Sequence, residues 1–227
     1  MKRILNDAGD EQTLNLGSDT AFTKNYIIKL FNQMTKLKGQ FMDVDGARVD
    51  YDGMKGSPDY KVYCQLAQNL VYIDLNLLDE STTKAFFINL YNALCMHALV
   101  EGLLQGSFLG DSIARLRMYA SASYNIGGNI YSLNDIEHGI LRNNSQSPAP
   151  FSRKVQFDAN DPRSKYSIPC DPRIHFALNC GAESCPPIAI YSMDEDKPEK
   201  LENQLNIATE CFIENSANFH ASNEVIT

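Results

Sequence analysis

The residues best suited to chemistry lie in one short stretch in which a histidine is followed by two cysteines. Cys180 stands in the turn Asn179-Cys180-Gly181, His175 lies five residues before it, and Cys185 follows. A cysteine attacks a carbonyl as its thiolate, which a nearby imidazole favours, and backbone N–H groups in a glycine turn can hold the oxyanion. The pattern therefore predicts Cys180 as a nucleophile, His175 as its base and Gly181 as an oxyanion donor that binds substrate.

A second histidine offers another base. His138 and Arg142 are four residues apart on a predicted helix at 132–142, so they share one face. His138 is an alternative base for Cys180, with Glu137, Asn92 or Asp171 orienting its ring. Arg142 either binds an anionic group of the substrate or forms a structural salt bridge. The sequence leaves open which histidine is the base, because positions 175 and 180 face opposite sides of a strand that stays extended.

A third set of polar residues lies in an otherwise apolar segment, Ser81 to Gly102, which reads as a central buried helix. Asn89, Asn92 and His97 must find hydrogen-bond partners there, because an unpaired buried polar group costs about 1–3 kcal/mol. We take Asn89 as a further candidate for substrate binding. The competing interpretation is a non-catalytic interaction module, in which these asparagines form a buried network with the 137–142 residues.

A metal site is the weakest alternative. Cys170, His175, Cys180 and Cys185 recur every five residues and are all zinc-ligand types. No Cys-x-x-Cys pair is present, and we therefore expect neither a metal nor a cofactor. Cys180 and Cys185 can equally be small buried apolar residues.

The elements that must position these residues indicate a helix-rich α+β fold with a small antiparallel sheet. Residues 1–17 are predicted to be a disordered leader and 18–227 one globular domain, with 143–170 a long surface loop. Hydrophobic periodicity, caps and turn residues predict helices at about 19–39, 57–70, 81–102, 132–142 and 197–214, a hairpin at 123–131 and short strands at 49–51 and 174–178.

The composition limits the classes of partner that the protein is expected to bind. The 227 residues carry 20 basic and 28 acidic side chains, a net charge of −8, which argues against nucleic acid or an anionic membrane as the main partner. No apolar run reaches the roughly 18 residues of a membrane span, and the polar start is no signal peptide. Six scattered cysteines then indicate reduced thiols in the cytoplasm, with an unidentified protein or peptide as partner or substrate.

Four ordered blocks resemble one family, the domain of unknown function 547 family. They are AFFINLYNAL with HAL (85–99), YNIGG (124–128), SLNDIEHGILR (132–142) and HFALNCGAESCPP (175–187). The resemblance covers about residues 75–215 and implies that the chain continues beyond Thr227. It also implies that Cys180 falls at a position usually kept as cysteine, whereas Cys185 falls where other members have Ser or Gly.

The family's name states no activity. Its cysteine, histidine and acid blocks are similar to those of papain-like and transglutaminase-like thiol enzymes, an analogy of parts. We therefore expect an intracellular thiol-dependent hydrolase or acyltransferase, with the non-catalytic module as the alternative.

Overall fold

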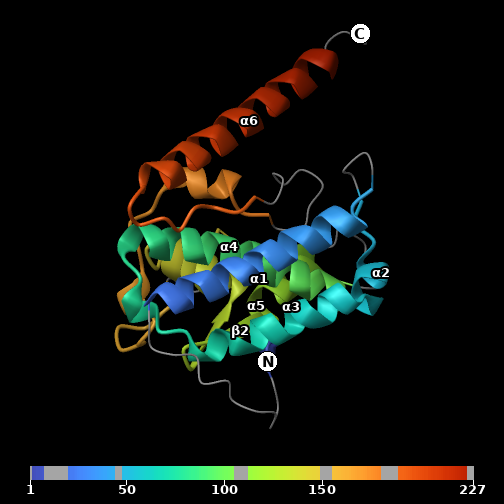
Figure 1. Cartoon of the computed structure of the whole chain (residues 1–227). Helices are drawn as coiled ribbons and strands as arrows, with labels where there is room; N and C mark the ends of the chain where they lie inside the picture. Colours follow the sequence, from blue (N-terminus) through green and yellow to red (C-terminus); the bar gives the residue numbers. More distant parts are fainter. Residues whose placement is uncertain are drawn as a thin grey trace.

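The computed structural model describes residues 2–7, 20–43, 48–104, 112–148, 155–179 and 189–223, without the side chains of 20–23 and 215–223. One long helix, α4 (Glu80–Val100), lies at the centre, and α1 (Thr20–Phe41) and α2 (Tyr51–Gly56) pack against it (Figure 1). The side chain of Asp79 caps α4 by accepting the Thr82 N–H at 2.7 Å. Because α4 is apolar on nearly all sides, it is buried along most of its length, as the sequence predicts.

The structure confirms the helix start that the sequence predicts after Ser57. The hydroxyl of Ser57 accepts the Tyr60 N–H at 3.1 Å, and Pro58 opens α3 (Pro58–Gln68). The expected strand at 49–51 is wrong. Val49 forms only an isolated bridge with Met42, because Asp50 caps α2 and Tyr51 already belongs to that helix.

The predicted hairpin is present, within a sheet of order β1-β2-β3. Strands β2 (Ala122–Ile126) and β3 (Asn129–Ser132) pair antiparallel around Gly127 and Gly128, whose φ angles of 56° and 82° suit glycine. A Cβ on Gly127 would also meet the Ile73 carbonyl oxygen at 2.6 Å. The turn therefore requires glycine at this position.

Two expectations about the sheet need correction. Arg3 and Ile4 form β1 (Arg3–Ile4), which pairs parallel with β2, so the sheet is mixed rather than antiparallel. Residues 2–7 are consequently part of the fold and not of a disordered leader, whereas 8–17 lie outside the described residues. The helix before β2, α5 (Ser112–Ser121), was also not predicted.

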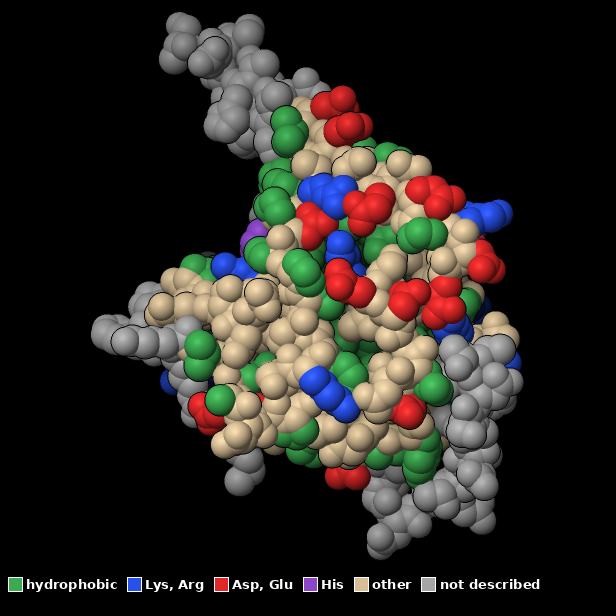
Figure 2. Space-filling view, turned by 90° about the vertical axis from the view of Figure 1, so that its left-hand side faces the viewer, with side chains coloured by type: hydrophobic (Ala, Val, Ile, Leu, Met, Phe, Trp, Pro, Cys, Tyr) green, Lys and Arg blue, Asp and Glu red, His purple; other side chains and the backbone are tan. Residues whose placement is uncertain are grey.

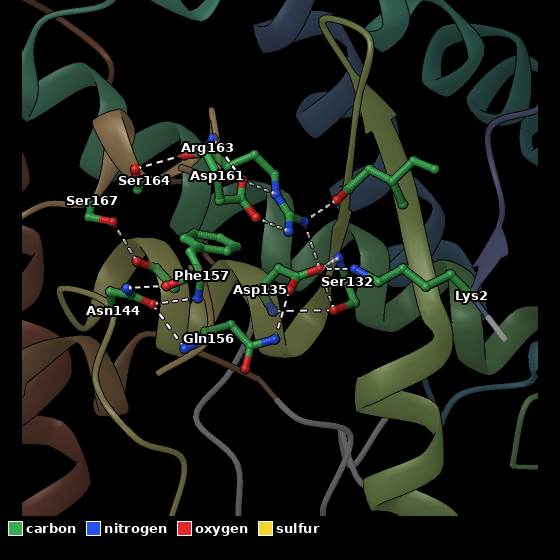
Figure 3. Close-up of polar contacts among 12 residues, drawn as sticks. Lys2, Ser132, Asp135, Asn144, Gln156, Phe157, Asp161, Arg163, Ser164 and Ser167 are labelled. Atoms are coloured by element: carbon green, nitrogen blue, oxygen red, sulfur yellow. Dashed lines mark hydrogen bonds and ion pairs between the residues drawn. The ribbon is translucent and has the colours of Figure 1, made fainter. Parts of the chain in front are cut away.

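The segment after the hairpin forms the helix η3 (Asp135–Leu141) at the predicted place, but as a π-helix. The expected capping box is present, because the Ser132 hydroxyl accepts the Asp135 N–H at 3.2 Å and the Asp135 carboxylate accepts the Ser132 N–H at 2.9 Å (Figure 3). A Cβ on Gly139 would stand 2.3 Å from the Phe157 ring. Residue 139 must therefore lack a side chain for Phe157 to pack on η3.

The predicted surface loop at 143–170 is in part tied to the core. The Asn144 side chain accepts the N–H groups of Gln156 and Phe157 and donates to the Phe157 carbonyl, and Phe157 itself is buried (Figure 3). Within this stretch lies the 3-10 turn η4 (Ser164–Tyr166), and Ile168 is buried as well. These contacts hold one side of the loop against η3.

The expected strand at 174–178 is wrong, because its first residues form the 3-10 helix η5 (Pro172–Phe176). The Asp171 carboxylate caps η5 by accepting the Arg173 N–H at 3.1 Å, and Pro172 opens it. The chain therefore turns through His175.

The last helix, α6 (Glu199–Asn223), packs on η5, with the rings of Phe176 and Phe212 5.1 Å apart, and leans away from the body toward its C-terminal end (Figure 1). Acidic and basic side chains lie intermixed around its base (Figure 2). Arg173 pairs there with Asp171 and Glu202, and Lys200 pairs with Asp194. None of the helices, within the part of the chain described, is long and apolar enough to cross a membrane.

Candidate functional site

His138 and Arg142 are in contact at the C-terminal end of η3, and the charge of Arg142 also acts on His175 of η5. His138 is buried, with 4% of its surface exposed, and its Nδ1 lies 2.8 Å from Nη1 of Arg142. A guanidinium carries only N–H donors, so Nδ1 must be the acceptor. The His138 ring is therefore neutral, with its proton on Nε2.

The electrostatics of the cluster agree with neutral rings. Burial lowers the pKa of His138 to about 4, and the charges of Arg142 and of His175 lower it further in the same direction. Burial of part of the ring and the charge of Arg142 also lower the pKa of His175, although that side chain is exposed. At neutral pH both imidazoles thus hold a lone pair, but that of His138 is already used by Arg142.

Arg142 has no direct acidic partner among the residues that the structure describes. No carboxylate of the described residues forms an ion pair with it, and its Nε–H is buried without any hydrogen-bond partner. A carboxylate, that of Glu137, lies near the His138 Nδ1: its Oε1 is 3.8 Å from that nitrogen, and its Oε2 accepts the hydroxyl of Tyr91 at 3.3 Å. The Arg142 guanidinium thus contacts a neutral imidazole and retains one N–H donor that is not hydrogen-bonded.

The two asparagines of α4 bind backbone rather than a histidine. Asn92 is fully buried, donates to the Ala177 carbonyl at 3.0 Å and accepts the Asn179 N–H at 2.8 Å. Asn89 makes the matching pair of bonds to Tyr191, at 2.9 Å to its carbonyl and 2.8 Å from its N–H. Asn92 therefore fixes the backbone before Cys180 instead of orienting a ring, and both ends of the Asn89 amide are occupied by the fold.

These two amides hold the chain on either side of 180–188. Cys180, Gly181 and Cys185 lie in this stretch, outside the described residues, so their roles stay predictions. The same holds for a metal site that includes them. Among the residues that are described, no three His, Cys, Asp or Glu side chains are grouped for a metal, and Cys170 is an exposed free thiol. The other described cysteines, Cys64, Cys95 and Cys211, are likewise not joined in disulfides.

The third predicted polar residue of α4, His97, belongs to a different cluster. Its Nδ1 lies 2.8 Å from the Tyr124 hydroxyl, which in turn lies 2.7 Å from the hydroxyl of Tyr63. The Tyr63 hydroxyl donates onward to the Ala93 carbonyl at 3.1 Å. Burial lowers the pKa of His97 to about 4. This histidine serves the core, as its burial of 98% implies, and stands apart from His138 and His175.

Sequence reasoning missed a charged cluster on η3. The buried Asp135 carboxylate pairs with Lys2 and with Arg163, and accepts from Gln156 at 2.7 Å (Figure 3). The capping box predicted only the local bonds between Asp135 and Ser132. No sequence signal joins Lys2 or Arg163 to this carboxylate, because both come from distant parts of the chain.

Comparison with known proteins supports one assignment. The family model described as "Protein of unknown function, DUF547" matches residues 75–213, which hold the central helix, the hairpin, η3 and η5. No curated protein and no solved structure matches the chain, so the expected papain-like or transglutaminase-like fold has no support. With more than half of its length matched, the chain belongs to the DUF547 family of proteins of unknown function.

Proposed function

We propose that the protein is a cytoplasmic thiol-dependent hydrolase or acyltransferase, with Cys180 as nucleophile and His175 as base. One observation carries the proposal. His175 is an exposed imidazole whose pKa is lowered by partial burial and by the charge of Arg142, and it lies on the segment whose backbone Asn92 fixes at Asn179, the residue before Cys180. A general base needs an available lone pair and a pKa near or below the working pH.

His175 suits the base better than His138. The His138 lone pair on Nδ1 accepts from Arg142, and its Nε2 carries the proton, so this ring can only donate. We assign His138 to hold Arg142 in place. A guanidinium near a thiol lowers its pKa, and the role that we propose for Arg142 is to favour the Cys180 thiolate in this way.

The proposed reaction is acyl transfer through a thioester. The Cys180 thiolate bonds to the acyl carbon, and the carbonyl electrons move onto oxygen, where the N–H of Gly181 holds the oxyanion. The bond to the leaving group then breaks, and the leaving group takes the proton that His175 received from the thiol. Water or another nucleophile attacks the thioester, returns a proton through His175 and regenerates Cys180.

The test is covalent acylation by p-nitrophenyl acetate, followed as p-nitrophenolate release and mapped by peptide mass spectrometry. We expect acetyl thioester on Cys180, lost in Cys180→Ala and slowed about 100-fold or more in His175→Ala, because general-base catalysis contributes roughly 10²–10⁴. Cys170→Ala is the matched control, since Cys170 is an exposed free thiol. Equal acylation of Cys170 and Cys180 would contradict the proposal.

One observation favours the second candidate, a non-catalytic interaction module. The side-chain amides of both α4 asparagines form hydrogen bonds with the backbone, as expected of a purely structural network. In that case His138→Ala lowers the melting temperature sharply, and Cys180 resembles the other cysteines in its reactivity. The acylation experiment separates the two candidates, because only the enzyme gives a specific thioester.

A further inference from the structure

We infer that α6 binds the α6 of a second copy of this chain, with the two helices antiparallel. The inference is independent of the proposed chemistry and starts from the face of α6 that is turned away from η5. Ile207 lies on that face with 57% of its surface exposed. A single exposed isoleucine is ordinary on a protein surface, so the inference depends on the charges that flank it.

A base and an acid flank Ile207 at equal spacing on the same face of α6. Lys200 precedes it by seven residues, and Glu214 follows it by seven. Residues seven apart on a helix differ in direction by only about 20°, so the three side chains form one stripe. All three are exposed. In chain order the stripe is therefore a base, an apolar residue and an acid, spread over about 21 Å.

This order of charges is complementary to its own reverse. A two-fold axis at Ile207 places Ile207 against the same residue of the second copy and places Lys200 of each copy against Glu214 of the other. A parallel pair of helices would instead place like charges opposite each other, which disfavours it. The charges therefore select the antiparallel arrangement, a closed dimer in which both copies make the same contacts.

The stripe is accessible to a second copy. Phe212, which packs on Phe176 of η5, points about 140° around the helix from Ile207, and α6 leans away from the body (Figure 1). The two bodies would thus lie on the outer sides of the helix pair. Glu214 forms no ion pair with the residues that the structure describes, and the bond of Lys200 to Asp194 is an exposed pair, which contributes little to stability.

Sedimentation equilibrium of the full chain, over a micromolar-to-millimolar concentration series, tests the inference. One helix from each copy gives an interface below about 1,200 Å², so we expect a weak, reversible dimer. Ile207→Gln should raise its Kd about tenfold, because it removes the central apolar contact. Ile213→Gln is the matched control: Ile213 is also 57% exposed, but it points about 120° away from Ile207 and should leave the Kd unchanged.

Charge reversal tests the antiparallel direction. Lys200→Glu and Glu214→Lys each place like charges opposite each other and should raise the Kd about tenfold or more. The double variant restores opposite charges at both ends and should return the Kd toward that of the natural chain. This recovery distinguishes a lost contact from a damaged fold, and circular dichroism of each variant confirms that the helices are intact.

A cross-link tests the register. The axis at Ile207 places residue 203 of one copy opposite Cys211 of the other, and Cys211 is an exposed free thiol. Asn203→Cys should therefore give a disulfide-linked dimer with diamide as oxidant, mapped to 203–211 by peptide mass spectrometry. The two positions within one chain are about 12 Å apart along the helix, too far for a disulfide. Asn206→Cys, turned about 100° from Ile207, is the control and should not form the link.

The outcomes decide the inference. A chain that sediments as a monomer throughout the series overturns it and leaves this acidic and apolar face to a basic partner protein. A dimer that both single charge reversals leave intact, or that the double reversal fails to restore, overturns it as well. So does a cross-link that forms as readily through residue 206 as through residue 203.

Discussion

Two arginines, Arg142 at the end of η3 and Arg163 in the segment packed beside it, have opposite electrostatic surroundings. Arg163 pairs with the carboxylates of Asp161 at 2.7 Å and Asp135 at 3.1 Å, and its guanidinium carbon lies 4.4 Å from the centre of the Phe157 ring (Figure 3). Arg142, at the end of the same helix, contacts the neutral ring of His138 and has a buried Nε–H without an acceptor.

The difference separates a structural cation from one that is available to a ligand. Lys2 and Arg163 balance the carboxylates of Asp135 and Asp161, and the cluster joins the residue before β1 to η3 and to the 155–168 segment. Within the described part of the chain no carboxylate forms an ion pair with Arg142, whose charge also lowers the pKa of the exposed His175. Two arginines of equal charge can therefore have different roles, and the presence or absence of a carboxylate partner distinguishes these roles.

The largest expected effect is the loss of the Asp135 carboxylate. Asp135→Ala leaves Lys2 and Arg163 without this buried acid, and we expect the free energy of unfolding to fall by about 3–5 kcal/mol. Urea denaturation followed by circular dichroism measures it. Asp158→Ala is the matched control, because Asp158 is exposed and should change stability by less than about 0.5 kcal/mol. A loss below 1 kcal/mol in Asp135→Ala would remove the contrast between the two clusters.

Acid should weaken the protein through its two buried histidines. The folded pKa of His97 and of His138 is about 4, below the ordinary histidine value of 6.5, so between these values the unfolded chain binds protons that the folded chain does not. Stability is therefore greatest above pH 6.5 and falls as the pH drops toward 4. We expect a loss of about 4 kcal/mol between pH 7 and pH 5, from roughly 1.4 kcal/mol per pH unit below pH 6.5 for each of the two histidines. Urea unfolding at both pH values checks it, and equal stability would show that these rings are not held neutral.

Loss of either α4 amide should cost about 2 kcal/mol. Asn92→Ala and Asn89→Ala each leave one buried carbonyl and one N–H without a partner, at roughly 1 kcal/mol or more for each bond. Denaturant unfolding compares the two variants. Only Asn92→Ala should also slow acylation of Cys180 markedly, because only Asn92 holds the residue before it. Equal slowing in both variants would assign the effect to general loosening.

The smallest effect on stability should come from Arg142 itself. Arg142→Gln removes a cation without an acidic partner, so we expect a change of less than about 1 kcal/mol. The variant should nevertheless raise the pKa of His138 and of His175, because the charge of Arg142 lowers both. Imidazole proton NMR over pH 4–8 measures these shifts. Arg163→Gln is the contrasting variant, expected to destabilise the fold and leave both pKa values in place.

The parts of the fold set by neighbouring residues were predictable. Ser57-Pro58 predicts the start of α3, and Gly127-Gly128 predicts the hairpin, because helix caps and glycine turns depend on residues only a few positions apart. The strand β1 was not predictable, since its two residues gain their partners from β2, more than a hundred positions away. At η5 the alternating pattern after Arg173 indicated a strand, but the Asp171 cap and Pro172 determine a helical turn.

The candidate site likewise has contacts that follow from local sequence spacing and contacts that depend on how distant segments pack. The contact between His138 and Arg142 follows from their spacing on one helix, and it is present. The approach of His175 to them depends on how η5 packs, which no local pattern encodes. The backbone partners of Asn92 lie 85 and 87 positions away, so the sequence could show that this amide needs partners but not which ones.

The activation of Cys180 is tested most directly by the pH dependence of its alkylation. The rate constant for iodoacetamide at each of the six cysteines is measured by mass spectrometry from pH 5 to pH 9, in the natural chain and in His175→Ala. We predict that Cys180 alone titrates well below the usual thiol pKa of about 8.5, and that His175→Ala returns it toward that value. A Cys180 that labels no faster than Cys170 at pH 6 would contradict the thiol enzyme and leave the structural module.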